Sequence, residues 1–201
     1  MNSMSKIFID VHTHHRRENT LSPTMMGIHP WEADQGLNLP DFSDCDIIGE
    51  TGLDYACEVS REAQERLFRA HLQAAVALQK PVVLHIVRAM NDALSILADY
   101  ELQGVVIHGF IGSPEQATEC IRRGYYLSFG HRSLRSPKSC RAIAATPLDR
   151  LFCETDDDPA ADIAEVYHRV AEIKCVEVDE LLHAIEQNYR RVIKKYDEEL
   201  A

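Results

Sequence analysis

The chain of 201 residues is 45% hydrophobic and carries a formal net charge of −11, from 32 acidic and 21 basic residues. This apolar content is enough for one core, so we expect a single globular domain over residues 1–201. The negative charge excludes a protein that binds nucleic acid through a long basic surface. It does not exclude an enzyme in which metal ions bring positive charge to a phosphoester.

The sequence also indicates where the protein works. It has no run of about 18 apolar residues, so we expect no membrane association. The polar segment Met1–Lys6 lacks the pattern of a signal peptide, which favours a cytoplasmic location. The six cysteines lie far apart without a Cys-x-x-Cys pair, so we expect reduced and mostly packed thiols.

Short apolar runs alternate with amphipathic stretches along the whole chain. Runs that are apolar without alternation are typical of parallel strands covered on both faces. The expected strands are Ile7–Val11, Thr24–Ile28, Ile47–Glu50, Val82–His85, Val105–His108, Tyr125–Phe129 and Leu151–Cys153. Alternation of strands and helices in one domain predicts an α/β fold with about seven parallel strands.

The helices are predicted from their ends. Ser60 is a suitable N-cap for a helix that ends before Lys80-Pro81, and Ser113-Pro114-Glu115-Gln116 has the pattern of a capping box. Gly124 marks the end of this second helix. Three further helices are expected, over Pro137–Ala145, Pro159–Ile173 and Asp179–Tyr196.

Residues of types able to bind metal ions stand at the ends of most of these strands. They are His12, His14, Glu50, His85, His108 and Asp156. In a closed parallel barrel the carboxyl ends of the strands converge on one mouth, whereas an open sheet spreads them along a line. This distribution therefore favours a TIM-type barrel and a metal site built from these six residues.

The ligand types restrict the metal without identifying it. His12 and His14 are two residues apart, so on an extended strand both imidazoles point to the same side. Nitrogen and carboxylate ligands without thiolate suit Zn, Mn, Fe, Ni or Mg. We expect one or two divalent cations.

Six motifs in order resemble those of the TatD family of metal-dependent deoxyribonucleases, a branch of the amidohydrolase-like barrels. They are Ile9–His14, Gly27–Pro30, Ile48–Tyr55, Pro81–His85, Ile107–Gly112 and Glu154–Asp156, and residues 64–78 and 188–191 are also similar. The resemblance covers almost the whole chain. It implies a distorted TIM-type barrel, and a metal-dependent hydrolase that acts on DNA or another phosphoester.

The resemblance also implies roles for individual residues. His12, His14 and Asp156 would hold one ion, His85 and His108 the second, with Glu50 between them. Asp156 would orient or deprotonate the attacking water, and Glu50 is its companion as a catalytic candidate.

Three departures from the family pattern stand out. Only 14 residues separate His14 from His29, where the family usually inserts a helix, a strand and another helix. The barrel is therefore expected to be incomplete, either open or completed by a second copy in a homo-oligomer. Arg88 is displaced by one position from the usual arginine, and Asp156 is followed by an extra acidic residue.

Several residues near these motifs have two interpretations. His29 binds a substrate phosphate or packs in a loop, and Arg88 is the second candidate for substrate binding. Asp10 orients a ligand imidazole or makes a structural hydrogen bond, and for Glu154 the structural role is favoured. Arg16 and Arg17 either face a phosphate or lie in a solvated turn. The other histidines are expected on the surface or on helices; these are His15, His71, His131, His168 and His183.

Three functions follow from these patterns. The leading one is a metal-dependent phosphodiesterase that trims DNA from an end. The same ligands could instead serve an amide or ester hydrolase, including one for aminoacyl esters on tRNA, because activated water attacks carbon or phosphorus alike. The third is a metal-binding protein that has lost activity together with the missing segment.

Overall fold

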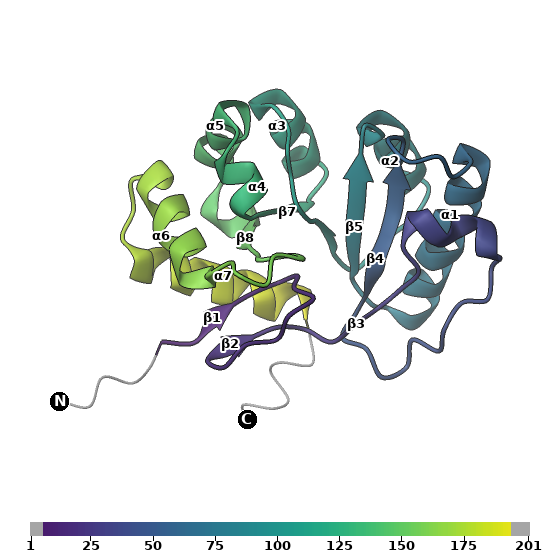
Figure 1. Ribbon diagram of the computed structural model, residues 1–201, viewed down its shortest axis with the longest axis horizontal. Helices are drawn as coiled ribbons and strands as arrows, with labels where there is room; N and C mark the ends of the chain where they lie inside the picture. Colours follow the sequence, from purple (N-terminus) through teal and green to yellow (C-terminus); the bar gives the residue numbers. More distant parts are fainter. Residues whose placement is uncertain (1–5, 194–201) are drawn as a thin grey trace. The chain divides into compact units, whose positions relative to one another are not determined.

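The computed structural model describes residues 6–193, which form two compact units (Figure 1). The central unit comprises residues 23–108 with 192 and 193, and the terminal unit comprises residues 6–22 and 109–191. In the described residues, the paired strands within each unit are parallel, which confirms the predicted α/β class.

The central unit is a four-stranded parallel sheet with helices between its strands. Its strands follow the order of the chain, β3-β4-β5-β6. Its elements are β3 (Met25–Met26), the 3₁₀ helix η1 (Pro30–Gln35), β4 (Ile47–Asp54), α1 (Arg61–Leu78), β5 (Val82–Val87), α2 (Met90–Leu97) and β6 (Val105–Ile107). Sequential order without a reversal is the order of a β/α barrel, whereas doubly wound sheets reverse it at a switch point.

The terminal unit contains the first two strands and the last two. Its elements are β1 (Phe8–Ile9), β2 (Thr20–Leu21), α3 (Pro114–Arg122), β7 (Tyr126–Phe129), α4 (His131–Leu134), α5 (Pro137–Ala145), the 3₁₀ helix η2 (Leu148–Arg150), β8 (Leu151–Cys153), α6 (Ile163–Lys174) and α7 (Val178–Val192). The amide of Val11 donates to the carbonyl of Cys153 at 3.2 Å, so the chain leaving β1 lies beside β8. Contact between the first and last strands is the neighbour relation that closes a barrel.

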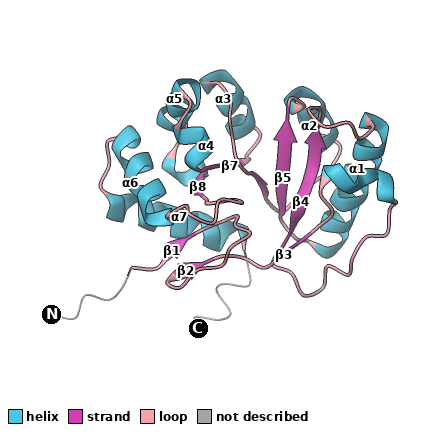
Figure 2. Cartoon of the chain, in the orientation of Figure 1, coloured by secondary structure: helices cyan, strands magenta, loops and turns pink. Residues whose placement is uncertain are grey.

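All seven predicted strands are present, with bounds that differ by a few residues. The structure adds an eighth, β2, which pairs with β1 through the amide of Asp10 and the carbonyl of Leu21 at 3.0 Å. With only two residues, β2 is too short for an apolar run to reveal. The connection between β1 and β2, residues 10–19, contains no helix (Figure 2), in agreement with the shortened interval between His14 and His29.

Capping residues place most helices where the sequence predicts them. Ser60 accepts a hydrogen bond from the amide of Ala63 at the start of α1, and Ser113 and Gln116 form the predicted capping box of α3. Helix α5 has the predicted bounds. Helix α6 begins four residues later than expected, because Asp162 is its cap rather than Pro159 its first residue. Helix α7 ends at Val192 in the described residues, and positions 194–196 of its predicted span lie outside them.

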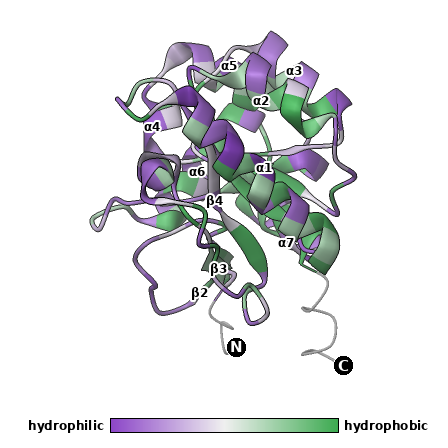
Figure 3. Cartoon of the chain, turned by 90° about the vertical axis from the view of Figure 1, so that its right-hand side faces the viewer, coloured by the Kyte–Doolittle hydropathy of each residue, from purple (hydrophilic) through white to green (hydrophobic). Residues whose placement is uncertain are grey.

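Helix α1 alternates between hydrophilic and hydrophobic residues along its length (Figure 3) and packs its apolar side on β4. His71 lies on this side, which confirms the expected helix position, and its side chain is fully buried. Its Nε2 accepts from the amide of Ile28 at 3.0 Å, and its Nδ1 lies 2.9 Å from the carbonyl of Leu67. A neutral imidazole with the proton on Nδ1 satisfies both contacts, and burial lowers the pKa of His71.

Two further features bear on the predictions. All six cysteines are free thiols, three of them buried, as expected. Within residues 6–193, no helix combines the length and apolar character that crossing a bilayer requires.

Candidate metal centres

The terminal unit brings three of the predicted ligands together. Nε2 of His12 lies 3.4 Å from Oδ1 of Asp156, and Nε2 of His14 lies 3.8 Å from the same oxygen. Two ligands of one tetrahedral Zn²⁺ lie about 3.3 Å apart, given metal–ligand bonds of about 2.0 Å. The two nitrogens and one oxygen therefore fit one divalent cation.

The main chain holds these ligands in place. The amide of Asp156 donates to the carbonyl of His12, and the amide of His14 donates to the carbonyl of Asp156, both at 3.0 Å. Thr13 and Asp156 form an isolated parallel bridge. Both ligand-bearing segments are thus locked to each other by backbone hydrogen bonds immediately beyond β1 and β8.

Asp10 makes structural hydrogen bonds to Thr155. Its carboxylate accepts from the amide of Thr155 at 3.0 Å and from the Thr155 hydroxyl at 2.6 Å. Burial raises the pKa of Asp10 to about 7, although both hydrogen bonds from Thr155 oppose this shift. Of its two predicted interpretations, these contacts support the structural one.

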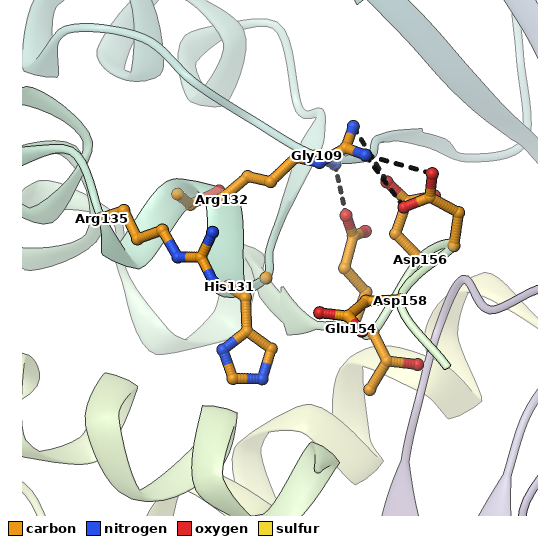
Figure 4. Close-up of a pocket in the computed structure, with 11 residues that line it drawn as sticks. Gly109, His131, Arg132, Arg135, Glu154, Asp156 and Asp158 are labelled. Carbon is orange, nitrogen blue, oxygen red and sulfur yellow. Dashed lines mark hydrogen bonds and ion pairs between the residues drawn. The ribbon is translucent and has the colours of Figure 1, made fainter. Parts of the chain in front are cut away.

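A cavity of about 270 Å³ adjoins this triad in the terminal unit. Figure 4 shows Arg132 extending from α4 toward Asp156, with His131 pointing the other way. Nη2 of Arg132 donates to both carboxylate oxygens of Asp157 at 3.0 and 3.1 Å, and its Nη1 lies 3.9 Å from Oδ2 of Asp156. Asp157, the acidic residue that follows Asp156 in the sequence, thus binds Arg132 beside the triad.

Other charged residues near the cavity have structural contacts. Oε1 of Glu154 accepts from the amide of Gly109 at 2.6 Å, which supports its favoured structural role. Arg17 donates to the carbonyls of Asp158 and Pro159 at 3.0 and 3.1 Å, so its guanidinium stabilises the turn after Asp156.

The central unit brings together a second set of ligands. Oε2 of Glu50 lies 2.8 Å from Nε2 of His108 and 3.6 Å from Nδ1 of His85. The two imidazole nitrogens are 3.3 Å apart. These three separations again match ligands of one small divalent cation. All three residues follow or occupy the strands β4, β5 and β6, as predicted.

A buried carboxylate orients His85. Nε2 of His85, the nitrogen directed away from Glu50, lies 3.2 Å from Oδ2 of Asp54. The indole of Trp31 donates to the same oxygen at 2.7 Å, and the amide of Ala56 donates to Oδ1 at 2.8 Å. Carboxylate–histidine pairs of this kind fix the tautomer of metal ligands. Burial, the largest influence, raises the pKa of Asp54, but these hydrogen bonds outweigh it and the pKa lies below its ordinary value.

His29 lies beside this second triad. Its Nε2 is 3.9 Å from Oε2 of Glu50, and its ring centre is 4.4 Å from that of His85. Its Nδ1 accepts from the amide of Trp31 at 3.3 Å, which places the proton of a neutral imidazole on Nε2. Burial, together with the neighbouring His85, lowers the pKa of His29 to about 4. His29 is therefore a neutral hydrogen-bond donor rather than a cation.

The second substrate-binding candidate has a different setting. Arg88 is exposed, directly after β5, with a φ of 54°. Tyr55, at the end of the motif Ile48–Tyr55, donates its hydroxyl to Asp92 at 2.8 Å, so this hydroxyl makes a structural hydrogen bond.

Sequence reasoning missed two features of these sites. It assigned no role to Arg132, because an arginine on a four-residue helix has no motif. It did not predict that Asp54 contacts His85, although Asp54 lies on the same strand as Glu50, four positions after it.

The strands follow the order of a β/α barrel, and imidazoles and carboxylates stand at their ends. These features are those of α/β barrel proteins that hold divalent cations. The family model for "TatD related DNase" matches residues 5–194, and the chain belongs to this family. This confirms the resemblance carried by the six sequence motifs.

Individual relatives agree with this assignment. The chain is 33% identical over 144 residues to a "Putative deoxyribonuclease TATDN1 homolog" of Vairimorpha ceranae, covering 70% of this chain and 54% of that protein. It is 30% identical over 189 residues to the "Uncharacterized metal-dependent hydrolase YcfH" of Escherichia coli, covering 83% of this chain and 71% of that protein. The chain thus spans little more than half the length of the first of these relatives.

A solved structure confirms the fold. The TatD family hydrolase of Entamoeba histolytica superposes with a TM-score of 0.80 at 16% identity, covering 95% of this chain and 99% of that one. Likeness at this identity shows the fold class, the TIM-type barrel predicted from the sequence.

Proposed function

We propose that this chain is a metal-dependent hydrolase that cleaves phosphodiester bonds in DNA. The observation that carries the proposal is the geometry of the two triads. Each offers two imidazole nitrogens and one carboxylate oxygen, at separations of 2.8–3.8 Å. The relatives named deoxyribonuclease and metal-dependent hydrolase support the reaction class.

The proposed ligands are His12, His14 and Asp156 for one divalent cation, and Glu50, His85 and His108 for another. A bound cation makes water acidic enough to lose a proton near neutral pH and stabilises the charge that develops on phosphate oxygens. The donor set does not select among Zn, Mn, Fe, Ni and Mg.

Asp156 can serve two purposes because its oxygens face different groups. Oδ1 faces the two imidazoles, and Oδ2 lies on the side of Arg132. We therefore assign Oδ1 to the cation and Oδ2 to orienting the attacking water and accepting its proton. Glu50 has the corresponding place in the central triad and is the second catalytic candidate.

Substrate binding is assigned to His29 and Arg88. The Nε2–H of His29 is a neutral donor beside Glu50, suited to a phosphate oxygen. Arg88 contributes a charge at the end of β5. A cytoplasmic location agrees with six free thiols. Association with a second copy stays a prediction, for which the solution mass is the test.

The test uses the metal-loaded protein on end-labelled single-stranded DNA and on a phosphodiester reporter. We expect His85→Ala and Asp156→Asn each to lower turnover by at least about 100-fold and to weaken binding of one cation. His168→Ala is the matched control, because His168 is exposed on α6 outside both triads. Turnover that survives both substitutions would come from a contaminating nuclease and would refute the proposal. Hydrolysis of a carboxylic ester or amide without phosphodiester cleavage would replace it with the alternative reaction.

A further inference from the structure

Trp31 is the one tryptophan of the sequence, and 60% of its surface is exposed. A single exposed apolar side chain needs no explanation by itself. Trp31 differs because its position is fixed by Asp54 and His29, two residues that lie against His85 of the central triad.

Two contacts hold the indole. Its Nε1 donates to Oδ2 of Asp54 at 2.7 Å, and the carboxylate of Asp54 is 5% exposed. Its ring meets the His29 ring edge to face, with 4.4 Å between centres and 77° between planes. An aromatic group held at its polar edge and against a neighbouring ring has little freedom left to lose when a ligand arrives.

The indole is also close to the proposed metal ligands. Its ring centre lies 6.1 Å from that of His85, and His85 shares Asp54 with it as a hydrogen-bond partner. A phosphate bound at His29, beside the cation that His85 would hold, therefore has its nucleoside within reach of the exposed indole.

We propose that Trp31 is a stacking platform for the base of the nucleotide whose phosphodiester is cleaved. This rests on the proposed function and names the part of the substrate that the site recognises besides phosphate. Every base has a π-face, so stacking of this kind tolerates any sequence.

The charge of the protein favours a contact of this type. With a net charge of −11, the chain cannot draw its affinity for DNA from a broad basic surface. Stacking adds affinity that does not depend on neutralising phosphates. Binding is therefore expected to depend weakly on salt.

Fluorescence tests the proposal directly, because all indole emission comes from Trp31. The Asp156→Asn protein, loaded with metal and slowed in turnover, is titrated with a short thymidine oligonucleotide and with an abasic oligonucleotide of equal length. We expect saturable quenching by the thymidine oligonucleotide and at least about fivefold weaker binding of the abasic one. Binding of the thymidine oligonucleotide, seen by anisotropy of an attached dye, without any change in indole emission would overturn the proposal.

Kinetics of Trp31 variants separate stacking from support of Asp54. For Trp31→Ala, stacking predicts a KM about 5- to 150-fold higher on base-bearing DNA, with the KM on the abasic substrate nearly unchanged. Trp31→Phe should restore part of this difference, because it keeps an aromatic face without the indole N–H. A merely structural role would instead lower kcat by the same factor on both substrates, in Trp31→Ala and in Trp31→Phe, and would weaken metal binding in both variants. That result would overturn the proposal. Unfolding curves of both variants verify that the fold is retained.

The outcomes also separate this proposal from the proposed function. Cleavage of DNA by the unsubstituted protein without quenching in the slowed variant refutes stacking and leaves the phosphodiesterase intact. Quenching by bases without cleavage of DNA refutes the phosphodiesterase and leaves base stacking intact. Absence of both cleavage and quenching refutes both.

Discussion

Replacement of Asp54 by asparagine tests how the central triad is oriented. Trp31 and His85 both direct a donor at Oδ2 of this carboxylate, and the amide of Ala56 directs a third donor at Oδ1. Asparagine has the same shape but only one acceptor oxygen. Whichever way its amide turns, its NH₂ group faces at least one of these N–H donors. The substitution therefore removes a charge and creates a conflict between donors without creating a cavity.

The expected size follows from these contacts. Hydrogen bonds to a charged acceptor contribute about 1.5–3 kcal/mol each, against about 0.5–1.5 kcal/mol for neutral ones. In the favourable amide orientation, His85 keeps its bond but loses the charge of its partner. The preference for the tautomer with Nδ1 unprotonated then weakens, and Nδ1 is the nitrogen that faces Glu50. We expect metal affinity at this triad to fall about 10- to 100-fold, as for other carboxylates that orient ligand histidines.

A competition titration with a chelating dye measures this affinity, with the terminal triad disabled by Asp156→Asn in both proteins compared. Asp99→Asn is the control, because Asp99 pairs with Arg69 on the surface at 3.0 Å and is 60% exposed. An affinity of the Asp54→Asn protein within twofold of the control would show that Asp54 does not orient His85. That result would refute the assignment of the Asp54–His85 pair.

Three further substitutions have defined outcomes. Because the pKa of His71 is lowered in the fold, below about pH 6.5 the unfolded chain takes up a proton that the folded chain does not. The free energy of unfolding of the original protein should therefore fall relative to that of His71→Gln, by up to about 1.4 kcal/mol per pH unit, in urea denaturation between pH 8 and pH 5. For Gly52→Ala, the added Cβ would lie 2.0 Å from the carbonyl oxygen of His85 at a φ of 145°, so we expect a loss of at least about 2 kcal/mol in thermal unfolding. Because Arg132 is exposed, we expect Arg132→Gln to change the free energy of unfolding by less than about 1 kcal/mol. The substitution removes a positive charge 3.9 Å from Asp156, so the terminal triad should bind a metal cation up to about fivefold more tightly in a dye competition.

Each of these predictions has a contradicting result. Parallel pH profiles for the His71 pair would mean that the imidazole is not held neutral in the fold. A Gly52→Ala protein as stable as the original would mean that β4 and β5 can separate at this point without cost. Weaker metal binding by Arg132→Gln would mean that the guanidinium positions Asp156 rather than repelling the cation.

The fold could be predicted where local physics decides the structure. Buried parallel strands are apolar throughout, so their positions can be predicted from apolar runs. The N-cap residues Ser60 and Ser113 indicate where helices α1 and α3 begin. Helix α2 gave no such signal, because its cap position holds Ala89 and makes no side-chain hydrogen bond. Strand β2 was missed because its pairing with β1 depends on tertiary contact, which two residues cannot encode in their own pattern.

The candidate ligands could be predicted because parallel strands have their carboxyl ends at one edge of the sheet. Residues at these strand ends are therefore expected to lie near one another, even when they are far apart in the sequence. Within each unit, three of the six predicted ligands come together. Contacts that depend on side-chain reach escaped prediction. Trp31 lies 23 residues from the carboxylate it binds, and Arg132 lies 25 residues from Asp157.

The short connection between β1 and β2 explains how a reduced chain can retain its first ligands. Parallel neighbours are usually joined by a dozen or more residues, often a helix, whereas here only residues 10–19 lie between the strands. Those residues contain His12 and His14 themselves. Backbone hydrogen bonds tie both ligands to Asp156 just after β8. These bonds hold the two imidazoles beside Asp156 although the interval between His14 and His29 is short, so the shortened interval is compatible with the proposed metal site.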